Sequence, residues 1–237
     1  MRSSAVWIAI IAGIVCFVAG FSFANYLNRS ELSGLRGENE RLKSNQGSDS
    51  TQLNLSNEEI DAKLAEAQQN SGDLTFQKSL GTGLYRYGVI KQDKAIIEKA
   101  LPVLLRAHGL DANDYEVIVM LGHAYYDHGY YGKEIASFER SRQFYNLALT
   151  KRPDDIEVRT DLGATYYVQE PPDYDKALTE FEKSLALNAK HEKTLSFAVL
   201  TLKKQNKDTS KYSNVLRTIN PNSPALRDID TPQANAQ

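Results

Sequence analysis

Leu121-Gly122-His123-Ala124-Tyr125-Tyr126 is the stretch that decides the fold of this chain, because its pattern occurs three times. Leu80-Gly81 precedes it and Leu162-Gly163 follows it, 41 residues away in each direction (80 to 121 and 121 to 162). Large apolar or aromatic residues follow in each copy: Leu84-Tyr85, Tyr125-Tyr126 and Tyr166-Tyr167. Self-similarity at such a period is typical of stacked helix pairs, which are usually binding surfaces rather than catalysts.

Each copy continues into a second helix, in which small and large residues keep fixed offsets. A turn is expected between the two helices, at Gly88 in the first copy, at Gly129 and Gly132 in the second, and at Pro171-Pro172-Asp173 in the third. The glycines of the Leu-Gly pairs, Gly81, Gly122 and Gly163, should let the helices approach closely, while apolar residues fill the space between the helices. The second-helix residues are Ala100, Leu104, Ala107; Ser141, Tyr145, Ala148; and Ala177, Phe181, Ser184.

At these residues the chain resembles the tetratricopeptide repeat family, although the tryptophan typical of that family is absent. The resemblance runs from Asp73 to about Pro221 and includes a degenerate fourth unit. It implies an all-α, right-handed α-solenoid of helix hairpins. The first two copies carry about seven extra residues before the second helix, which predicts longer helices. The matching structural positions are Leu80, Gly81, Leu121, Gly122, Leu162, Gly163, Ala107, Ala148, Pro153, Ala177 and Phe181.

The resemblance also implies an inner groove, lined by the first helices, that holds a peptide or a helix of a partner. Tyr85, Tyr126 and Tyr167 share one unit position, so stacking would set them in a ladder along this groove. The alternative is that these rings only pack between helix pairs. A chaperone-type carboxylate clamp is not expected, because Thr82 and Met120 stand where asparagines are needed. The predicted groove residues are Lys78, Thr82, Tyr85, Arg86, His123, Tyr126, Asp127 and Tyr167.

The amino terminus carries a second strong signal. Residues 5–24 contain no charge and are rich in Ile, Val and Phe, and about 20 such residues span the ~30 Å hydrocarbon core of a bilayer. A cleaved secretory signal is the alternative, since Ser22-Phe23-Ala24 has the form of a cleavage site. The length of the apolar run favours a transmembrane anchor, assigned to residues 1–27.

Two arguments on orientation disagree. A short tail bearing Arg2 normally stays in the cytoplasm, which would export everything after the helix. Counting Lys and Arg alone, the downstream flank is more basic, with Arg29, Arg36, Arg41 and Lys43. We give more weight to the short tail, because both interpretations of the leader export the domain. The expected location is a single-pass membrane protein with a periplasmic or extracytoplasmic repeat domain.

Residues 28–55 are expected to form a short stalk followed by a polar linker. Leu32, Leu35, Asn39 and Leu42 follow a heptad pattern that would support a weak homodimer of tethered chains. A solvated helical stalk explains the pattern equally well. The folded repeat domain is assigned to residues 56–221, opening with a capping box at Ser56 and Glu59. Residues 222–237 lack aromatic side chains and are expected to be disordered.

The composition narrows the classes of function. The net charge of −2 predicts no attraction to nucleic acid, and the four histidines show no spacing typical of a metal site. No phosphate-binding loop and no marked nucleophile is present, so neither an enzyme nor a cofactor is expected.

Two hypotheses remain. The first is a membrane-tethered scaffold that binds a protein or peptide partner. Its expected place is envelope assembly or cytochrome maturation, where similar anchored repeat proteins act. The second is a structural module that self-associates through the membrane helix and the heptad segment.

Overall fold

The computed structural model describes residues 54–227, and within this range the chain is helical, with no β-strand. The all-α fold class predicted from the repeat is therefore confirmed for these residues. They divide into two compact units, the first ending at Leu110 and the second beginning at Asp111. No helix in the described range is long and apolar enough to cross a membrane. The predicted anchor, nearly all of the predicted stalk and linker, and the end of the tail lie outside the described residues.

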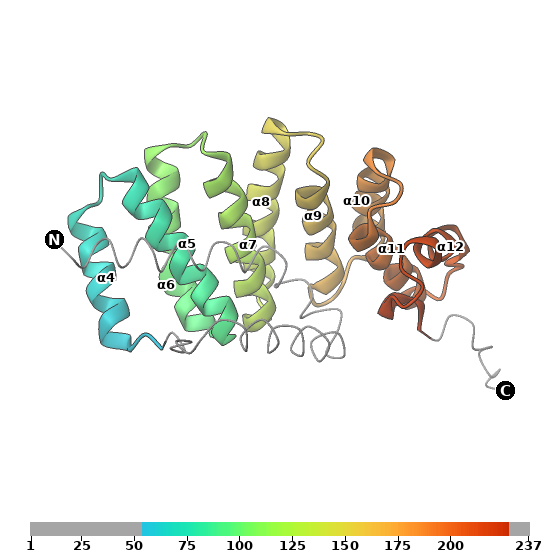
Figure 1. Ribbon diagram of the computed structural model, residues 1–237, viewed down its shortest axis with the longest axis horizontal. Helices are drawn as coiled ribbons and strands as arrows, with labels where there is room; N and C mark the ends of the chain where they lie inside the picture. Colours follow the sequence, from blue (N-terminus) through green and yellow to red (C-terminus); the bar gives the residue numbers. More distant parts are fainter. Residues whose placement is uncertain (1–53, 228–237) are drawn as a thin grey trace, which may run out of the picture. The chain divides into compact units, whose positions relative to one another are not determined.

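The first unit contains α4 (Asn57–Gln69), α5 (Leu74–Lys91) and α6 (Lys94–Leu110) (Figure 1). α4 begins with the predicted capping box, in which the Glu59 backbone N–H donates to Ser56 Oγ over 3.2 Å. The Ser56 N–H donates in return to the Glu59 carboxylate over 2.8 Å. Two backbone donors that the first helical turn would otherwise leave unpaired are thus satisfied.

The described part of the second unit, residues 111–227, contains six α-helices followed by the 3₁₀ helix η1 (Pro224–Leu226), and Figure 1 shows these helices following one another as hairpins. The helices of the second and third repeats lie adjacent, and α8 also packs on α9. α11 and α12 form a fourth helix pair in the region where the sequence predicts a degenerate fourth unit. The helices are α7 (Tyr115–Gly132), α8 (Ile135–Lys151), α9 (Ile156–Val168), α10 (Tyr174–Leu187), α11 (Glu192–Lys204) and α12 (Ser210–Ile219).

The repeated glycines lie where each first helix meets its second helix. A Cβ atom built on Gly122 would lie 2.5 Å from Cε1 of Tyr145, and one on Gly163 would lie 2.5 Å from Cε1 of Phe181. In the first unit a Cβ on Gly81 would lie 2.8 Å from Cγ of Leu104. Real side chains do not approach so closely, so these positions require glycine. The helices therefore approach closely at these three glycines, as the sequence pattern predicts for them.

The start of the first helix in each of the first three repeats is fixed by an aspartate that recurs with the repeat. Asp73, Asp114 and Asp155 each accept a hydrogen bond from the backbone N–H three residues later, over 3.0, 3.1 and 2.9 Å. This is the N-cap arrangement, which satisfies a free donor of the first turn and is worth about 1 kcal/mol per helix. The 41-residue period therefore sets helix starts as well as packing.

The turns predicted at Gly88 and Gly129 are wrong, because these glycines lie inside α5 and α7. The chain reverses at Gln92 and at Lys133, which both have a left-handed φ of 54°, so the turn predicted at Gly132 lies directly after that residue. The helices continue because Gly88 is a further contact point: a Cβ there would lie 2.9 Å from the backbone nitrogen of Ile97. The helices of the first two repeats are correspondingly longer than those of the third, as the extra residues predicted.

The folded region also extends past its predicted end at Pro221. Ser223, Ala225 and Leu226 are buried, and η1 packs against α11. The prediction of disorder from residue 222 is therefore wrong for the segment up to Arg227. Ala225 and Leu226 supply the apolar surface that a cap on the last helices requires, although no aromatic residue marks the segment.

Candidate functional site

The first-helix face of the first unit is the face of α5 that carries Lys78, Thr82 and Arg86, all of which are half-buried. Tyr85, the fourth groove residue predicted on this helix, is only 5% exposed. A ring so deeply buried offers little surface to a partner. At this position the alternative interpretation, a tyrosine that packs, fits better than the ladder.

On α7, His123 and Tyr126 are half-buried and Asp127 is buried. The ring of Tyr126 stacks parallel to that of Tyr130, with the centroids 6.5 Å apart, and meets Phe138 edge to face at 5.8 Å. Tyr130 is 42% exposed. The end of α7 therefore presents aromatic surface that begins in the core at Phe138 and reaches solvent at Tyr130.

On α9, Tyr167 is 9% exposed and belongs to an aromatic cluster. Its ring lies 5.7 Å from that of Tyr174 and 5.6 Å from that of Phe197, and Phe197 in turn stacks on Phe181 at 5.1 Å. Tyr167 thus joins α9 to α10 and α11. Of the three tyrosines predicted as a ladder, only Tyr126 combines packing with substantial exposure.

A connected row of polar side chains crosses the first helices of the second unit, and we call it the polar chain. His123 Nε2 on α7 lies 3.0 Å from Asp161 Oδ2 on α9, and the other oxygen of Asp161 accepts from Lys193 Nζ on α11 over 2.7 Å. Lys193 also donates to Glu157 over 3.0 Å, and Glu157 lies 2.7 Å from His191 Nε2. Three successive first helices are therefore linked by polar and charged side chains.

Burial makes the middle of this polar chain stronger than an ordinary surface ion pair. The side chains of Asp161 and Lys193 are 18% and 19% exposed. Burial by itself would raise the pKa of Asp161, but Lys193 and the bond with His123 outweigh it and lower that pKa to about 2. Burial likewise opposes the charge of Lys193, yet the two carboxylates raise its pKa. The bond with His191 contributes most to the pKa of about 2 at Glu157. All three groups are therefore charged at neutral pH.

A buried cluster of hydroxyl groups lies beneath the polar chain. Thr160 Oγ1 on α9 lies 2.6 Å from Thr194 Oγ1 on α11 and 2.9 Å from Ser184 Oγ on α10. Thr194 also meets His191 Nδ1 at 2.6 Å. Buried polar networks whose members are all bonded specify one arrangement of the helices. The cluster therefore fixes α9, α10 and α11 under the row of charges.

The sequence prediction included His123 but did not pair it with Asp161, and it did not include the bonds of Lys193 to Asp161 and Glu157. One signal could have found them: with Glu192 as the first residue of the fourth unit, Lys193 takes the same unit position as Glu116 and Glu157. Opposite charges at equal positions of neighbouring repeats are expected to pair. Asp127, in contrast, is buried and is not part of the polar chain.

Other groups of polar side chains in the described residues give less support for a catalytic or metal-binding site. His128 Nδ1 lies 2.8 Å from Ser137 Oγ, but the carboxylate of Glu134 meets that same nitrogen at 3.5 Å, so the order of groups required for a catalytic relay is missing. Across residues 54–227, no cluster of three or more His, Cys, Asp or Glu side chains could hold a metal.

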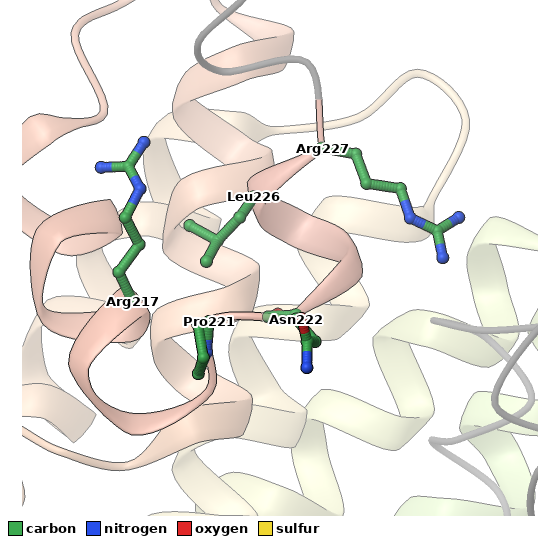
Figure 2. A pocket seen from close by; sticks show the side chains of 6 residues that line it. Arg217, Pro221, Asn222, Leu226 and Arg227 are labelled. Carbon is green, nitrogen blue, oxygen red and sulfur yellow. The ribbon is translucent and has the colours of Figure 1, made fainter.

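A surface pocket lies at the end of the second unit, lined by Arg217, Pro221, Asn222, Ser223, Leu226 and Arg227. Figure 2 shows the two arginine side chains on opposite sides of Leu226, with their guanidinium groups pointing away from each other. They do not converge on one point, as recognition of a single anion by both arginines would require.

Comparison with known proteins gives limited information. No protein-family model matches the chain. A similar protein is the transcription factor tau 131 kDa subunit of Saccharomyces cerevisiae, which is 30% identical over 83 residues. The match covers 35% of this chain but 8% of the yeast protein, so it spans a small part of that protein. This similarity assigns the chain to no family.

Proposed function

We propose that the chain is a membrane-tethered scaffold of tetratricopeptide-like hairpins, stacked as a right-handed solenoid, that binds a protein or peptide partner on its first-helix faces. The observation that carries the proposal is the division of roles around α7. Gly122 packs directly against the ring of Tyr145, while His123 and Tyr126 are half-buried and Tyr130 is 42% exposed. Tyrosine at a half-exposed helix face is typical of binding surfaces.

The polar chain supports the proposal because it holds this face in place. His123, Asp161 and Lys193 connect α7, α9 and α11 through contacts of 3.0 and 2.7 Å. A surface whose helices are already fixed loses less conformational entropy when a partner binds. The exposed aromatic end of α7 then supplies contact area, and the neighbouring charged groups supply selectivity.

The proposed membrane tether is inferred from the apolar run at residues 5–24. The proposal places the repeats outside the cytoplasm. Fusions of alkaline phosphatase or β-lactamase after Gln237 test this placement. Activity of the phosphatase and resistance from the lactamase are expected, because both reporters work outside the cytoplasm. A carboxyl terminus reported as cytoplasmic would reject the placement but leave the binding proposal open.

The binding proposal is tested by cross-linking and capture from native membranes with the full-length chain. Tyr126→Ala should reduce the captured partner, whereas Lys183→Ala on the second helix α10, a 53% exposed side chain, should not. Capture of the chain itself as the sole product, dependent on residues 28–43 and unchanged by Tyr126→Ala, would replace the scaffold with the self-association module.

A further inference from the structure

Arg86 on α5 has an unsatisfied donor. Its Nη1 atom is shielded from solvent and has no hydrogen-bond partner in the part of the chain that the structure describes. A guanidinium group has N–H donors and no acceptor, so this nitrogen can be satisfied only by a hydrogen-bond acceptor. Buried charged donors are normally paired, and one left unpaired is costly.

Another arginine of the same unit shows the usual arrangement. Arg106 on α6 donates to Gln68 Oε1 over 2.7 Å and to Gln77 Oε1 over 3.1 Å. Its guanidinium group therefore connects α6 to α4 and α5. Arg106 has a structural role that its contacts explain, whereas Arg86 Nη1 has no hydrogen-bond partner within the described residues.

The charge of α5 indicates what would pair with Arg86. The helix carries Lys78, Arg86 and Lys91 and has no acidic residue between Leu74 and Lys91. Arg86 also falls on the first-helix face, at a groove position predicted from the repeat. The planar guanidinium group suits a carboxylate, which can accept two parallel hydrogen bonds from it. Charge and geometry both favour an anionic occupant.

We propose that Arg86 is the recognition point for a carboxylate side chain on an acidic segment of the partner protein, bound along the first-helix face of α5. This inference rests on the proposed function and names the chemistry of its partner. Nη1 is already shielded from water in the unbound chain. A carboxylate that pairs with it therefore adds an ionic contact without the free-energy cost of removing water from this nitrogen. Arg86 as a whole is half-buried, so part of the residue is exposed at the surface of α5.

The first arm of the test measures stability on the full-length chain in detergent micelles. Thermal unfolding of Arg86→Met should occur at or above the wild-type temperature, because the substitution removes an unpaired buried donor and keeps the apolar stem. Arg106→Met should unfold at a lower temperature, because it leaves Gln68 and Gln77 without their donor. Unfolding of Arg86→Met well below wild type would show that Arg86 is structural, and would overturn the inference.

The second arm measures binding by fluorescence anisotropy with two labelled peptides, one of alternating glutamate and alanine and one with glutamine in place of glutamate. Wild type and Arg106→Met should prefer the glutamate peptide by roughly tenfold, and added salt should weaken that preference. Arg86→Met should lose most of it, while Arg86→Lys should retain part.

The remaining outcomes separate the inference from the proposed function. Equal binding of both peptides by wild type would overturn the acidic-partner inference, and capture that depends on Tyr126 would still support the scaffold. A glutamate preference that survives in Arg86→Met would assign the recognition to other cations. Higher affinity for the glutamate peptide after Asp228→Asn and Asp230→Asn would identify the carboxyl end of the chain itself as the occupant of Arg86, and would overturn the assignment to a partner.

Discussion

Substitution of Gly122 is the sharpest test of the helix contact that defines the repeat. A Cβ at this position would lie 2.5 and 2.6 Å from two carbons of the Tyr145 ring. Tyr145 is 1% exposed and belongs to a core cluster with Ile118 and Leu162, so the ring has little room to move. Ser141 Oγ also donates to the Gly122 carbonyl over 2.8 Å, which holds the two helices together at this point.

The magnitude follows from two opposing effects. Overpacking a core typically costs about 1–3 kcal/mol, while replacing a helical glycine by alanine returns about 1 kcal/mol through helix propensity. Gly122→Ala should therefore lose about 0–2 kcal/mol, and Gly122→Leu should lose more. For a domain of this size, 1 kcal/mol lowers the melting temperature by roughly 2–4 °C.

The assay is urea and thermal unfolding of the full-length chain, followed by far-UV circular dichroism. Gly109→Ala is the matched control, since Gly109 is also helical and nothing lies within 4 Å of a Cβ built there. It should gain up to about 1 kcal/mol. Tyr145→Leu, which destabilises by itself, should reduce the additional cost of Gly122→Ala, because both changes act on one contact. If Gly122→Ala and Gly109→Ala were equally stable, the repeat register derived from Leu121-Gly122 would be refuted.

Three further outcomes are expected. The pKa of Asp161 is lower in the folded chain than its ordinary value of 3.8, so its ionised form stabilises the fold above about pH 4. As the pH falls from about 4 through 2 this contribution of about 2 kcal/mol should be lost, and unfolding curves of Asp161→Asn should show a weaker acid dependence. Lys193→Met should lower the unfolding free energy at neutral pH by about 1–3 kcal/mol, since it leaves two carboxylates adjacent, and an unchanged urea midpoint would contradict the stabilising role of the polar chain. Tyr167→Ala should cost about 3–5 kcal/mol because the ring is buried, whereas Tyr126→Ala should weaken partner capture by about 2 kcal/mol. Tyr126→Phe should lose less affinity than Tyr126→Ala; the reverse order would assign recognition to the hydroxyl group.

Sequence periodicity was sufficient to predict the helical repeat because the residues that recur are those with one physical solution. Gly122 and Gly163 recur where two helices touch, and Asp114 and Asp155 recur where a first helix begins. Close contact and N-capping each depend on a residue type and its local position, so a single sequence reveals them.

The solvent exposure of the repeated tyrosines could not be predicted from the sequence pattern. Tyr126 and Tyr167 occupy equal unit positions, yet Tyr126 is half-buried and Tyr167 is buried. The difference arises because Phe197, from the following repeat, packs on Tyr167. A side chain on one helix thus decides the role of a side chain on another, and the periodic pattern contains no information on that contact.

The sequence by itself determined the helix class and the glycine contacts, because these depend on local spacing and side-chain size. Tertiary structure alone decided that Asp161 and Lys193 pair, that the helices continue through Gly88, and that Arg86 keeps an unbonded nitrogen. Each of these outcomes depends on which groups meet across helices distant in sequence. Ion pairing and burial depend on contacts between side chains of different helices, and these contacts exist only in the folded chain.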